Sequence, residues 1–259
     1  FDRYHKKKEH ILPKSHHKSS SHGLSESVEL LLKLAYLDAL GFASRRTNKE
    51  PRELFPLVLE KYVSAVGNFL LIKEKLGLQI GKATIVQGDC RHLTHLKIGA
   101  ETGIAEESID GIITSPPYSF AIDYLKGDRL QLEFMEQDID ELRRNMIGLR
   151  GRGIPKKVLN YIKDMDRAIG EMARVLKKDR YCVIVIGSNV IQLEHTLQMA
   201  IKENNHELLH EFEKSTRLED ALARIGERHG LTLERRLSHP IEGIRNVMRS
   251  EELLFLRKT

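Results

Sequence analysis

The sequence predicts an α/β fold, in which a mostly parallel β-sheet is covered by helices and ends in an antiparallel pair of strands. Two observations lead to this prediction. From about residue 83 onward, short runs of aliphatic and β-branched residues alternate with longer segments of helical periodicity, a pattern typical of parallel sheets. The last two strand-like runs, Thr232–Leu237 and Glu252–Arg257, have no helical segment between them, so we expect them to pair as antiparallel neighbours.

The composition is typical of a soluble globular protein. The 259 residues are enough to bury a sizeable core, and the formal net charge of +5 is compatible with a polyanionic partner. The two cysteines, Cys90 and Cys182, lack CxxC spacing, so we expect neither a metal site nor a disulfide, and the cytoplasm as the location. No apolar run approaches the roughly 18–20 residues of a membrane helix, so no membrane partner is expected.

The first part of the chain is predicted to be an arm followed by two helices. Residues 1–23 are polar and basic with almost no apolar periodicity, so we expect a flexible basic arm there and one domain over residues 24–259. The histidines of the arm repeat at no fixed spacing, which favours a solvated loop over a metal site. Apolar residues at helical spacing predict helices over Ser25–Gly41 and Pro51–Leu76, the second capped by Gly77.

The alternation of strands and helices begins after these helices. Ala83–Gln87 predicts a short buried strand that is stopped by Gly88 and Asp89, and Ser108–Thr114 predicts the next strand. A long insertion follows over residues 125–164. The elements expected after the insertion are a helix, a strand and a second helix, over Met165–Leu176, Tyr181–Gly187 and Leu208–His229.

One motif carries chemistry, because the strand that ends at Thr114 runs directly into Ser115-Pro116-Pro117-Tyr118. The two prolines fix φ and remove two backbone donors, and each disfavours helical geometry in the residue before it. The result is a stiff loop at the carboxyl end of a strand, where open α/β sheets bind ligands. A rigid surface turn is the alternative interpretation. The preceding strand and the aromatic residue that follows favour a binding loop.

Such a loop suits a planar base that carries an amino group. The amino lone pair is delocalised into the ring, so the nitrogen is a poor nucleophile. If the Ser115 oxygen and the Pro116 carbonyl each accept one N–H, the nitrogen is drawn toward tetrahedral geometry and its lone pair is concentrated. Tyr118 is placed to stack on the face of the base. A positioned methyl electrophile then completes the reaction, and catalysis is mostly orientation and electrostatics.

These residues resemble a known family. Thr-Ser-Pro-Pro-Tyr is similar to motif IV of the amino-group DNA methyltransferases, in which Asp, Asn or Ser precedes Pro-Pro-Tyr and the Ser form is most typical of cytosine-N4 enzymes. Gly88-Asp89-Cys90 resembles the family's motif III, which lies near the adenine of the cofactor. The resemblance implies a Rossmann-like sheet that binds S-adenosyl-L-methionine. It implies catalytic roles for Ser115, Pro116, Pro117 and Tyr118, and cofactor contacts for Gly88, Asp89, Cys90 and Thr114.

The resemblance extends over roughly Ala83–Thr259, so residues 24–259 are expected to hold the C-terminal part of the catalytic domain. Ala173–Gly187 is similar to the family's helix and fifth strand, and Glu251–Lys258 to its last strand.

The chain departs from the family before Asp89. The family has a glycine-rich loop after its first strand, which lets the backbone approach the cofactor, and no such loop precedes Asp89 here. The glycine-rich run Gly148–Gly153 follows no strand and does not qualify. Three explanations are open: first strands lost from a longer chain, a second chain that supplies them, or loss of cofactor binding. The start at Phe1 favours the first two.

The insertion contains a loop with cations, flexible glycines and no acid. Its cations are Arg150, Arg152, Lys156 and Lys157. We expect this loop to contact DNA phosphates beside the catalytic loop. A solvated connector is the equal alternative.

The predicted function is therefore methylation of an exocyclic amino group in double-stranded DNA, with cytosine N4 favoured over adenine N6. A base flipped out of the duplex would be held by the loop and take the methyl group directly, without a metal or a covalent enzyme intermediate. One alternative is an RNA methyltransferase acting on the guanine amino group. The other is a non-catalytic DNA-binding or assembly subunit, which the missing glycine loop supports.

Overall fold

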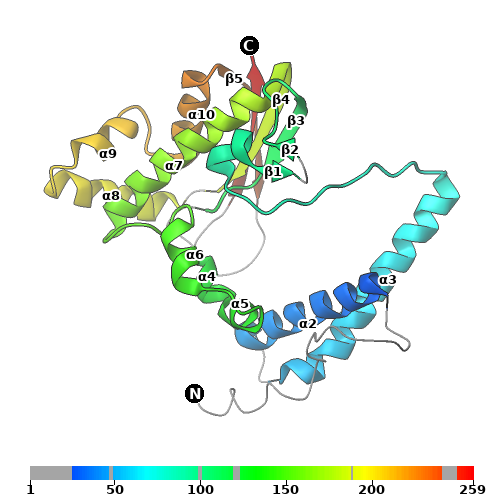
Figure 1. Cartoon of the computed structure of the whole chain (residues 1–259). Helices are drawn as coiled ribbons and strands as arrows, with labels where there is room; N and C mark the ends of the chain where they lie inside the picture. The colour runs from blue at the N-terminus through cyan, green and yellow to red at the C-terminus, as the bar shows by residue number, and fades with distance from the viewer. Residues whose placement is uncertain (1–24, 47–48, 99–100, 119–122, 188, 241–249) are drawn as a thin grey trace. The chain divides into compact units, whose positions relative to one another are not determined.

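The computed structural model describes residues 25–46, 49–98, 101–118, 123–187, 189–240 and 250–259, and the predicted basic arm lies outside them. The chain divides into two compact units, Phe1–Leu78 and Gln79–Thr259 (Figure 1). The single domain expected over residues 24–259 thus spans both units, and the strands and the candidate motifs all lie in the second.

The described part of the first unit consists of two helices, α2 (Glu26–Arg46) and α3 (Pro51–Leu76). They pack through a small buried cluster and an edge-to-face contact between Tyr36 and Phe55, whose ring centroids are 6.0 Å apart. The second helix has the predicted bounds and ends at Gly77, whose φ of 58° is left-handed. The predicted end of the first helix at Gly41 is wrong, because a single interior glycine costs only about 1 kcal/mol and the helix continues past it.

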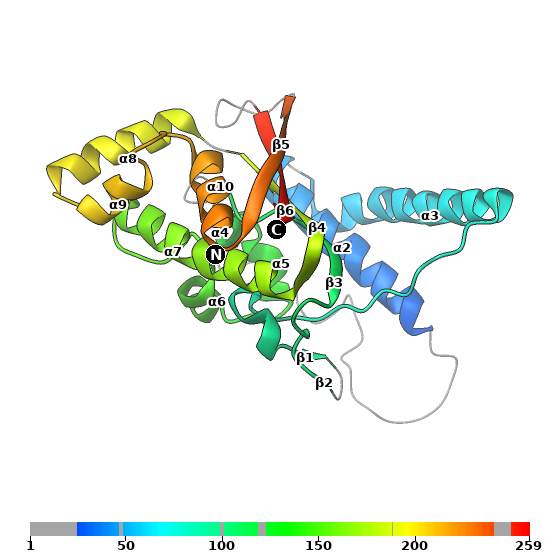
Figure 2. The ribbon, with the colours of Figure 1, turned by 90° about the horizontal axis from the view of Figure 1, so that it is seen from above.

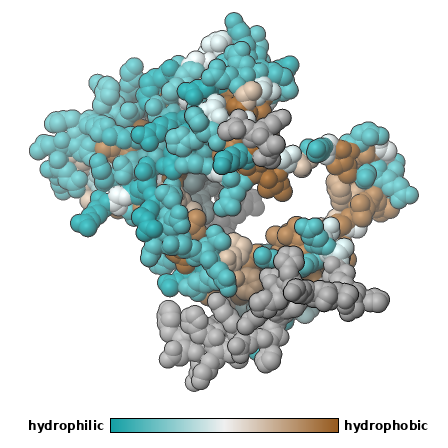
Figure 3. Space-filling view, viewed as in Figure 1, coloured by the Kyte–Doolittle hydropathy of each residue, from teal (hydrophilic) through white to brown (hydrophobic). Residues whose placement is uncertain are grey.

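Helix α3 exposes most of its apolar side chains, which Figure 3 shows as brown spheres. Among the described residues, α3 is the one helix that is long and apolar enough to cross a membrane. Only 6% of its most apolar 18-residue stretch is buried. This finding rests on length and composition alone, and the charged pair Glu60-Lys61 lies midway along the helix. One such helix is weak evidence for a membrane span.

The second unit is built on a four-stranded sheet with the order β3-β4-β6-β5. Strand β3 runs parallel to β4, whereas β6 is antiparallel to both β4 and β5. The prediction of an α/β fold that closes with an antiparallel C-terminal pair is confirmed, and the parallel part is one strand pair among the described residues. The strands are β3 (Ile109–Thr114), β4 (Leu176–Ile186), β5 (Leu231–Pro240) and β6 (Ser250–Lys258).

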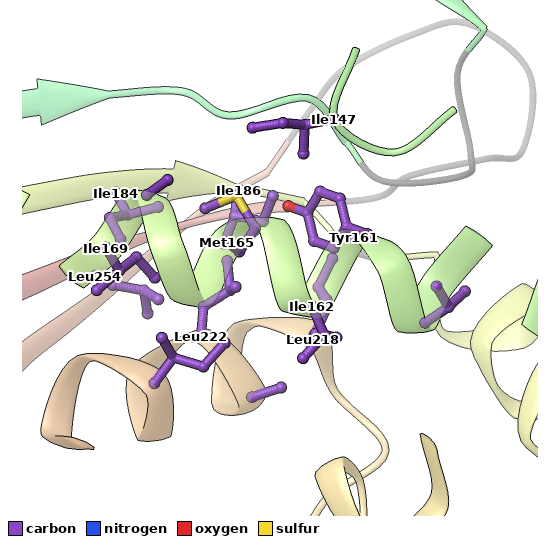
Figure 4. Close-up of a cluster of buried hydrophobic side chains, with 14 of the residues drawn as sticks. Ile147, Tyr161, Ile162, Met165, Ile169, Ile184, Ile186, Leu218, Leu222 and Leu254 are labelled. Atoms are coloured by element: carbon purple, nitrogen blue, oxygen red, sulfur yellow. The ribbon is translucent and has the colours of Figure 1, made fainter. Parts of the chain in front are cut away.

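The core of this unit lies between the sheet and helix α7 (Ile154–Val175), which begins eleven residues before the predicted start at Met165. Figure 4 shows Tyr161, Met165 and Ile169 of this helix beside Ile184 and Ile186 of β4. Helix α10 (Leu218–Arg228) packs against α7 and the C-terminal strands (Figure 2). The buried stripe on α7 fixes where the ends of β3 and β4 lie.

The other helices are short. The predicted helix over Leu208–His229 is wrong as a single element, because it is broken between α9 (His206–Glu211) and α10. At the break the Ser215 hydroxyl donates a hydrogen bond of 2.5 Å to the Asp220 carboxylate. Serine side chains that form local hydrogen bonds compete with helix formation. The remaining elements are η1 (Cys90–His95), β1 (Lys97–Ile98), β2 (Glu101–Thr102), α4 (Tyr124–Gly127), α5 (Arg129–Phe134), α6 (Ile139–Asn145) and α8 (Val190–Lys202).

Candidate functional site

The Ser-Pro-Pro-Tyr loop lies at the carboxyl end of the sheet. Strand β3 ends at Thr114, which is in register with Ile184 of the parallel strand β4. Because β6 is antiparallel, its first residues lie at the same end as the last residues of β4, with Glu252 opposite Ile186. The topology therefore brings three chain segments together at the edge where α/β sheets bind ligands.

The residues of the Ser-Pro-Pro-Tyr loop differ in burial. Pro116 is buried, Pro117 and Tyr118 are half-buried, and Ser115 is exposed. The buried proline fixes the loop to the unit, and the serine hydroxyl stays at the surface. A serine oxygen held on a backbone that lacks two N–H groups is the acceptor arrangement that the sequence predicts.

Tyr118 is held at both ends. Its backbone N–H donates to the hydroxyl of Tyr124 over 3.4 Å, and its own hydroxyl donates to the carboxylate of Glu251 in β6. Its ring packs against the main core. Burial and the hydrogen bond to Glu251 raise the pKa of Tyr118 to about 12, while a hydrogen bond from Ser115 acts in the opposite direction. The phenol is therefore neutral at ordinary pH.

A third tyrosine lies beneath these two, on helix α7. Tyr161 is fully buried, and among the described residues its hydroxyl has no hydrogen-bond partner. Figure 4 shows this hydroxyl directed toward Ile186 at the end of β4. Burial is the first cause that raises the pKa of Tyr161, and Tyr124 is the second. The core therefore holds a hydroxyl without a hydrogen-bond partner among the described residues near the end of β4.

The residues of the second motif are held by an ion-pair network. Asp89 caps η1 and accepts from the Arg91 backbone, while the Arg91 guanidinium binds both oxygens of the Asp89 carboxylate. This hydrogen bonding lowers the pKa of Asp89 despite partial burial. Arg91 also donates to Asp164 of α7 over 2.9 Å, and the Asp164 side chain is 1% exposed. The network ties the candidate cofactor segment to the helix that also carries Tyr161.

The other predicted cofactor residues have structural roles of their own. A Cβ on Gly88 would lie 2.0 Å from a methyl carbon of Leu96, so a larger residue there would displace the Leu96 side chain. Burial, followed by the charge of Asp89, raises the pKa of the Cys90 thiol. Burial raises the pKa of Cys182 to about 12. Neither thiol is ionised at neutral pH, so neither is an activated nucleophile.

The four cations of the insertion do not act as one group. Arg150 forms an ion pair with the buried Asp164, beside Arg91. Arg152 and Lys156 are exposed, and Lys157 is half-buried near Asp123, whose pKa it helps to lower. Contact with DNA phosphates stays a prediction for this loop, and Arg150 is also a structural residue.

The segment before Asp89 differs from the prediction. Ala83–Gln87 forms no strand, and Ile85 is 97% exposed, so the expected buried strand is wrong for the described structure. The reason is that no described strand pairs with it. Strand β3 is likewise the end of its sheet, and its Ile113 is 83% exposed.

Sequence reasoning missed Glu251 and the Arg91–Asp164 network. Tyr118 and Glu251 are 133 residues apart, and Arg91 and Asp164 are 73 apart, so no local spacing reveals either pair. One signal was available, because antiparallel pairing of the last strand places its first residues at the sheet end that carries the Ser-Pro-Pro-Tyr loop. Within the described ranges there is no cluster of three or more potential metal ligands.

No protein-family model matches the sequence, and no curated protein matches it significantly. Solved structures that resemble the chain include a candidate DNA modification methylase from Thermus thermophilus, with 16% identity over 66% of this chain and 50% of that one, and a TM-score of 0.33. The same protein in complex with S-adenosyl-L-methionine gives 15% identity, 66% and 51% coverage and a TM-score of 0.33.

A SAM-dependent methyltransferase from Methanosarcina mazei gives 12% identity over 62% of this chain and 71% of that one, with a TM-score of 0.32. The chain spans about half the length of the Thermus protein.

Proposed function

We propose that this chain carries the base-binding half of an S-adenosyl-L-methionine-dependent methyltransferase that acts on an exocyclic amino group of DNA, with cytosine N4 favoured. The observation that supports this best is the loop after β3, where Ser115 is exposed, Pro116 is buried and the Tyr118 hydroxyl accepts a hydrogen bond from Ser115. Two acceptors and one aromatic ring on a rigid backbone suit an amino-bearing base.

In the proposed reaction the residues of the chain bind and orient the amino group. The Ser115 oxygen and the Pro116 carbonyl each accept one N–H, which concentrates the nitrogen lone pair on the side away from them. Tyr118 stacks on the base and keeps its plane fixed. The cofactor, when bound, supplies an electrophilic methyl group. Orientation and hydrogen bonding provide the catalysis, no thiol takes part, and the proton that the amino group loses on methylation leaves to solvent.

The described residues fit only part of this cofactor. Asp89 and Cys90 lie at the start of η1 and Thr114 at the end of β3, which suits the adenine side, but no glycine-rich loop follows a strand among the described residues. The free side of β3 and the unpaired run Ala83–Gln87 support the proposal that further strands complete the sheet. A second chain or a preceding segment would supply them together with the loop.

The DNA must present a base outside the duplex, because an amino group within the stack is out of reach of the loop. Exposed Arg152 and Lys156, with Lys157, would neutralise phosphates close to the site. Arg150 is left out of this set because it pairs with Asp164.

A non-catalytic subunit is the second candidate, and the absence of such a glycine-rich loop from the described residues favours it. Binding of S-adenosyl-L-methionine separates the two candidates. Measurable affinity for the cofactor in the isolated chain would remove the subunit interpretation. Methylation of RNA and not of DNA would instead support a guanine-N2 enzyme.

The test is transfer of labelled methyl groups to duplex DNA and to RNA by the full protein with any partner chain. We expect transfer to DNA, and we expect Ser115→Ala to lower the rate by about 100-fold or more, as loss of one positioned hydrogen-bonding group does in other enzymes. Thr232→Ala in β5 is the control and should leave the rate unchanged. Equal rates for Ser115→Ala and wild type would contradict the proposal.

A further inference from the structure

We propose that Glu251 is a positioning residue that holds the Tyr118 ring in its base-stacking orientation. The inference rests on the proposed function and adds to it a residue that lies far from both motifs in the sequence. The Tyr118 hydroxyl donates to the Glu251 carboxylate, and the two residues come from the β3 loop and from β6.

The topology of the sheet brings the two residues together. The loop leaves β3 at Thr114, and β6 starts at Ser250 beside the carboxyl end of β4. Glu251 is in register with His239 of β5, and the next residue, Glu252, is opposite Ile186. Glu251 is thus paired with β5 and directly precedes the residue at which β6 also pairs with β4, and this pairing makes its carboxylate an anchor for the loop.

Glu251 restricts the side-chain rotation of Tyr118, which the two prolines do not fix. Two prolines fix the backbone before Tyr118, but they do not fix the rotation of its side chain. The backbone N–H of Tyr118 is bound by Tyr124, and the hydroxyl at the far end of the ring is bound by Glu251. With both ends held, the ring is ordered before a base arrives, and this preorganisation lowers the cost of stacking.

Glu252, the acidic residue next to Glu251, does not hold the Tyr118 hydroxyl. Glu252 is buried and lies 3.5 Å from Arg217, on the side of α10. A separate tyrosine–glutamate pair, Tyr181 and Glu234, lies at the opposite end of the sheet with a hydrogen bond of 2.5 Å between the two side chains. It has the same chemistry without the loop, so it provides a matched control.

The kinetic experiment compares Glu251→Ala, Glu251→Gln, Tyr118→Phe and the control Glu234→Ala in the full protein with any partner chain. Loss of the anchor should lower kcat about 10-fold in both Glu251→Ala and Tyr118→Phe, because misorientation by a fraction of an ångström is enough for such a loss. The KM for S-adenosyl-L-methionine should not change. Glu251→Gln keeps an acceptor oxygen and should restore most of the rate.

The double variant Tyr118→Phe/Glu251→Ala should be no slower than Tyr118→Phe, because Tyr118→Phe already removes the hydrogen bond that Glu251→Ala removes. Additive losses would overturn the proposal. So would a fall in activity for Glu234→Ala as large as that for Glu251→Ala, because it would show a general effect on the sheet.

A second measurement does not depend on activity. In protein labelled with carbon-13 at the tyrosine ring, the Tyr118 resonance is identified by its loss in Tyr118→Phe, and its titration is followed in each variant. The pKa of about 12 should fall toward 10.0 in Glu251→Gln and stay in place in Glu234→Ala. An unchanged titration in Glu251→Gln overturns the anchor. A shifted titration without any methyl transfer leaves the anchor intact and counts against the proposed function.

Discussion

The two candidate motifs lie in regions of very different completeness. The loop after β3 is held by the paired and buried part of the second unit, through Pro116 and the contact of Tyr118 with β6. The segment before Asp89 is extended and exposed, with Ile85 97% exposed. The difference indicates that this chain alone positions the Ser-Pro-Pro-Tyr loop, whereas the proposed cofactor side would need strands that the described residues do not include.

The largest expected effect is a loss of stability when the ion-pair network between the segment after Asp89 and helix α7 is broken. Replacing Asp164 by Asn removes a buried charge that pairs with Arg91 and Arg150, and should lower the free energy of unfolding by about 4 kcal/mol. Urea denaturation measures it. The exposed pair Arg129–Glu133 is the control, and Glu133→Ala should cost no more than about 0.5 kcal/mol. Similar losses at both sites would show that the network is not a structural link.

The next prediction compares two isoleucines of neighbouring strands. Ile184 is fully buried, so Ile184→Ala should lower the free energy of unfolding by about 3 kcal/mol. Ile113 is 83% exposed, and Ile113→Ala should change it by less than about 0.5 kcal/mol in the chain alone. A cost at Ile113 that appears only with a partner chain would identify the missing neighbour of β3. A large cost in the chain alone would contradict the open edge.

A smaller effect concerns the basic loop. If Arg152 and Lys156 contact phosphates, Arg152→Ala/Lys156→Ala should weaken DNA binding and reduce the slope of log affinity against log salt concentration by about 2. Fluorescence anisotropy at several salt concentrations measures the slope. Lys202→Ala, an exposed cation at the end of α8, is the control and should leave it unchanged. Identical slopes for the double variant and wild type would show that the loop does not contact DNA phosphates.

The smallest effect is on the pH dependence of stability. The pKa of Tyr118 is raised from 10.0 to about 12, so its protonated form is favoured in the folded state. This contribution is fully present below pH 10 and is lost as the pH rises from 10 to 12. Wild type should therefore lose more stability than Tyr118→Phe across this interval in urea denaturation. Parallel curves for the two proteins would show that Tyr118 does not gain this stability on folding.

The same comparison explains which elements the sequence predicts. Runs of aliphatic residues predict strands β3 and β6 correctly because each has at least one described strand to pair with. Helix α3 is predicted correctly from its periodicity and its glycine cap. The run Ala83–Gln87 has equal strand propensity and forms no strand, because strand formation needs a partner that propensity does not provide.

The site shows the same limit. Its loop is local in sequence and was predicted residue by residue. Glu251 and Asp164 join it through tertiary pairing over 133 and 73 residues, which no spacing rule detects.

The most direct test of the central claim is the identity of the modified nucleoside. Duplex DNA incubated with the full protein, any partner chain and S-adenosyl-L-methionine is digested and analysed by mass spectrometry. We expect N4-methylcytosine in DNA treated with the wild-type protein, and we expect this product to be lost with Ser115→Ala. Methylation at a ring carbon, or an amino-methylated product formed equally by Ser115→Ala, would contradict it.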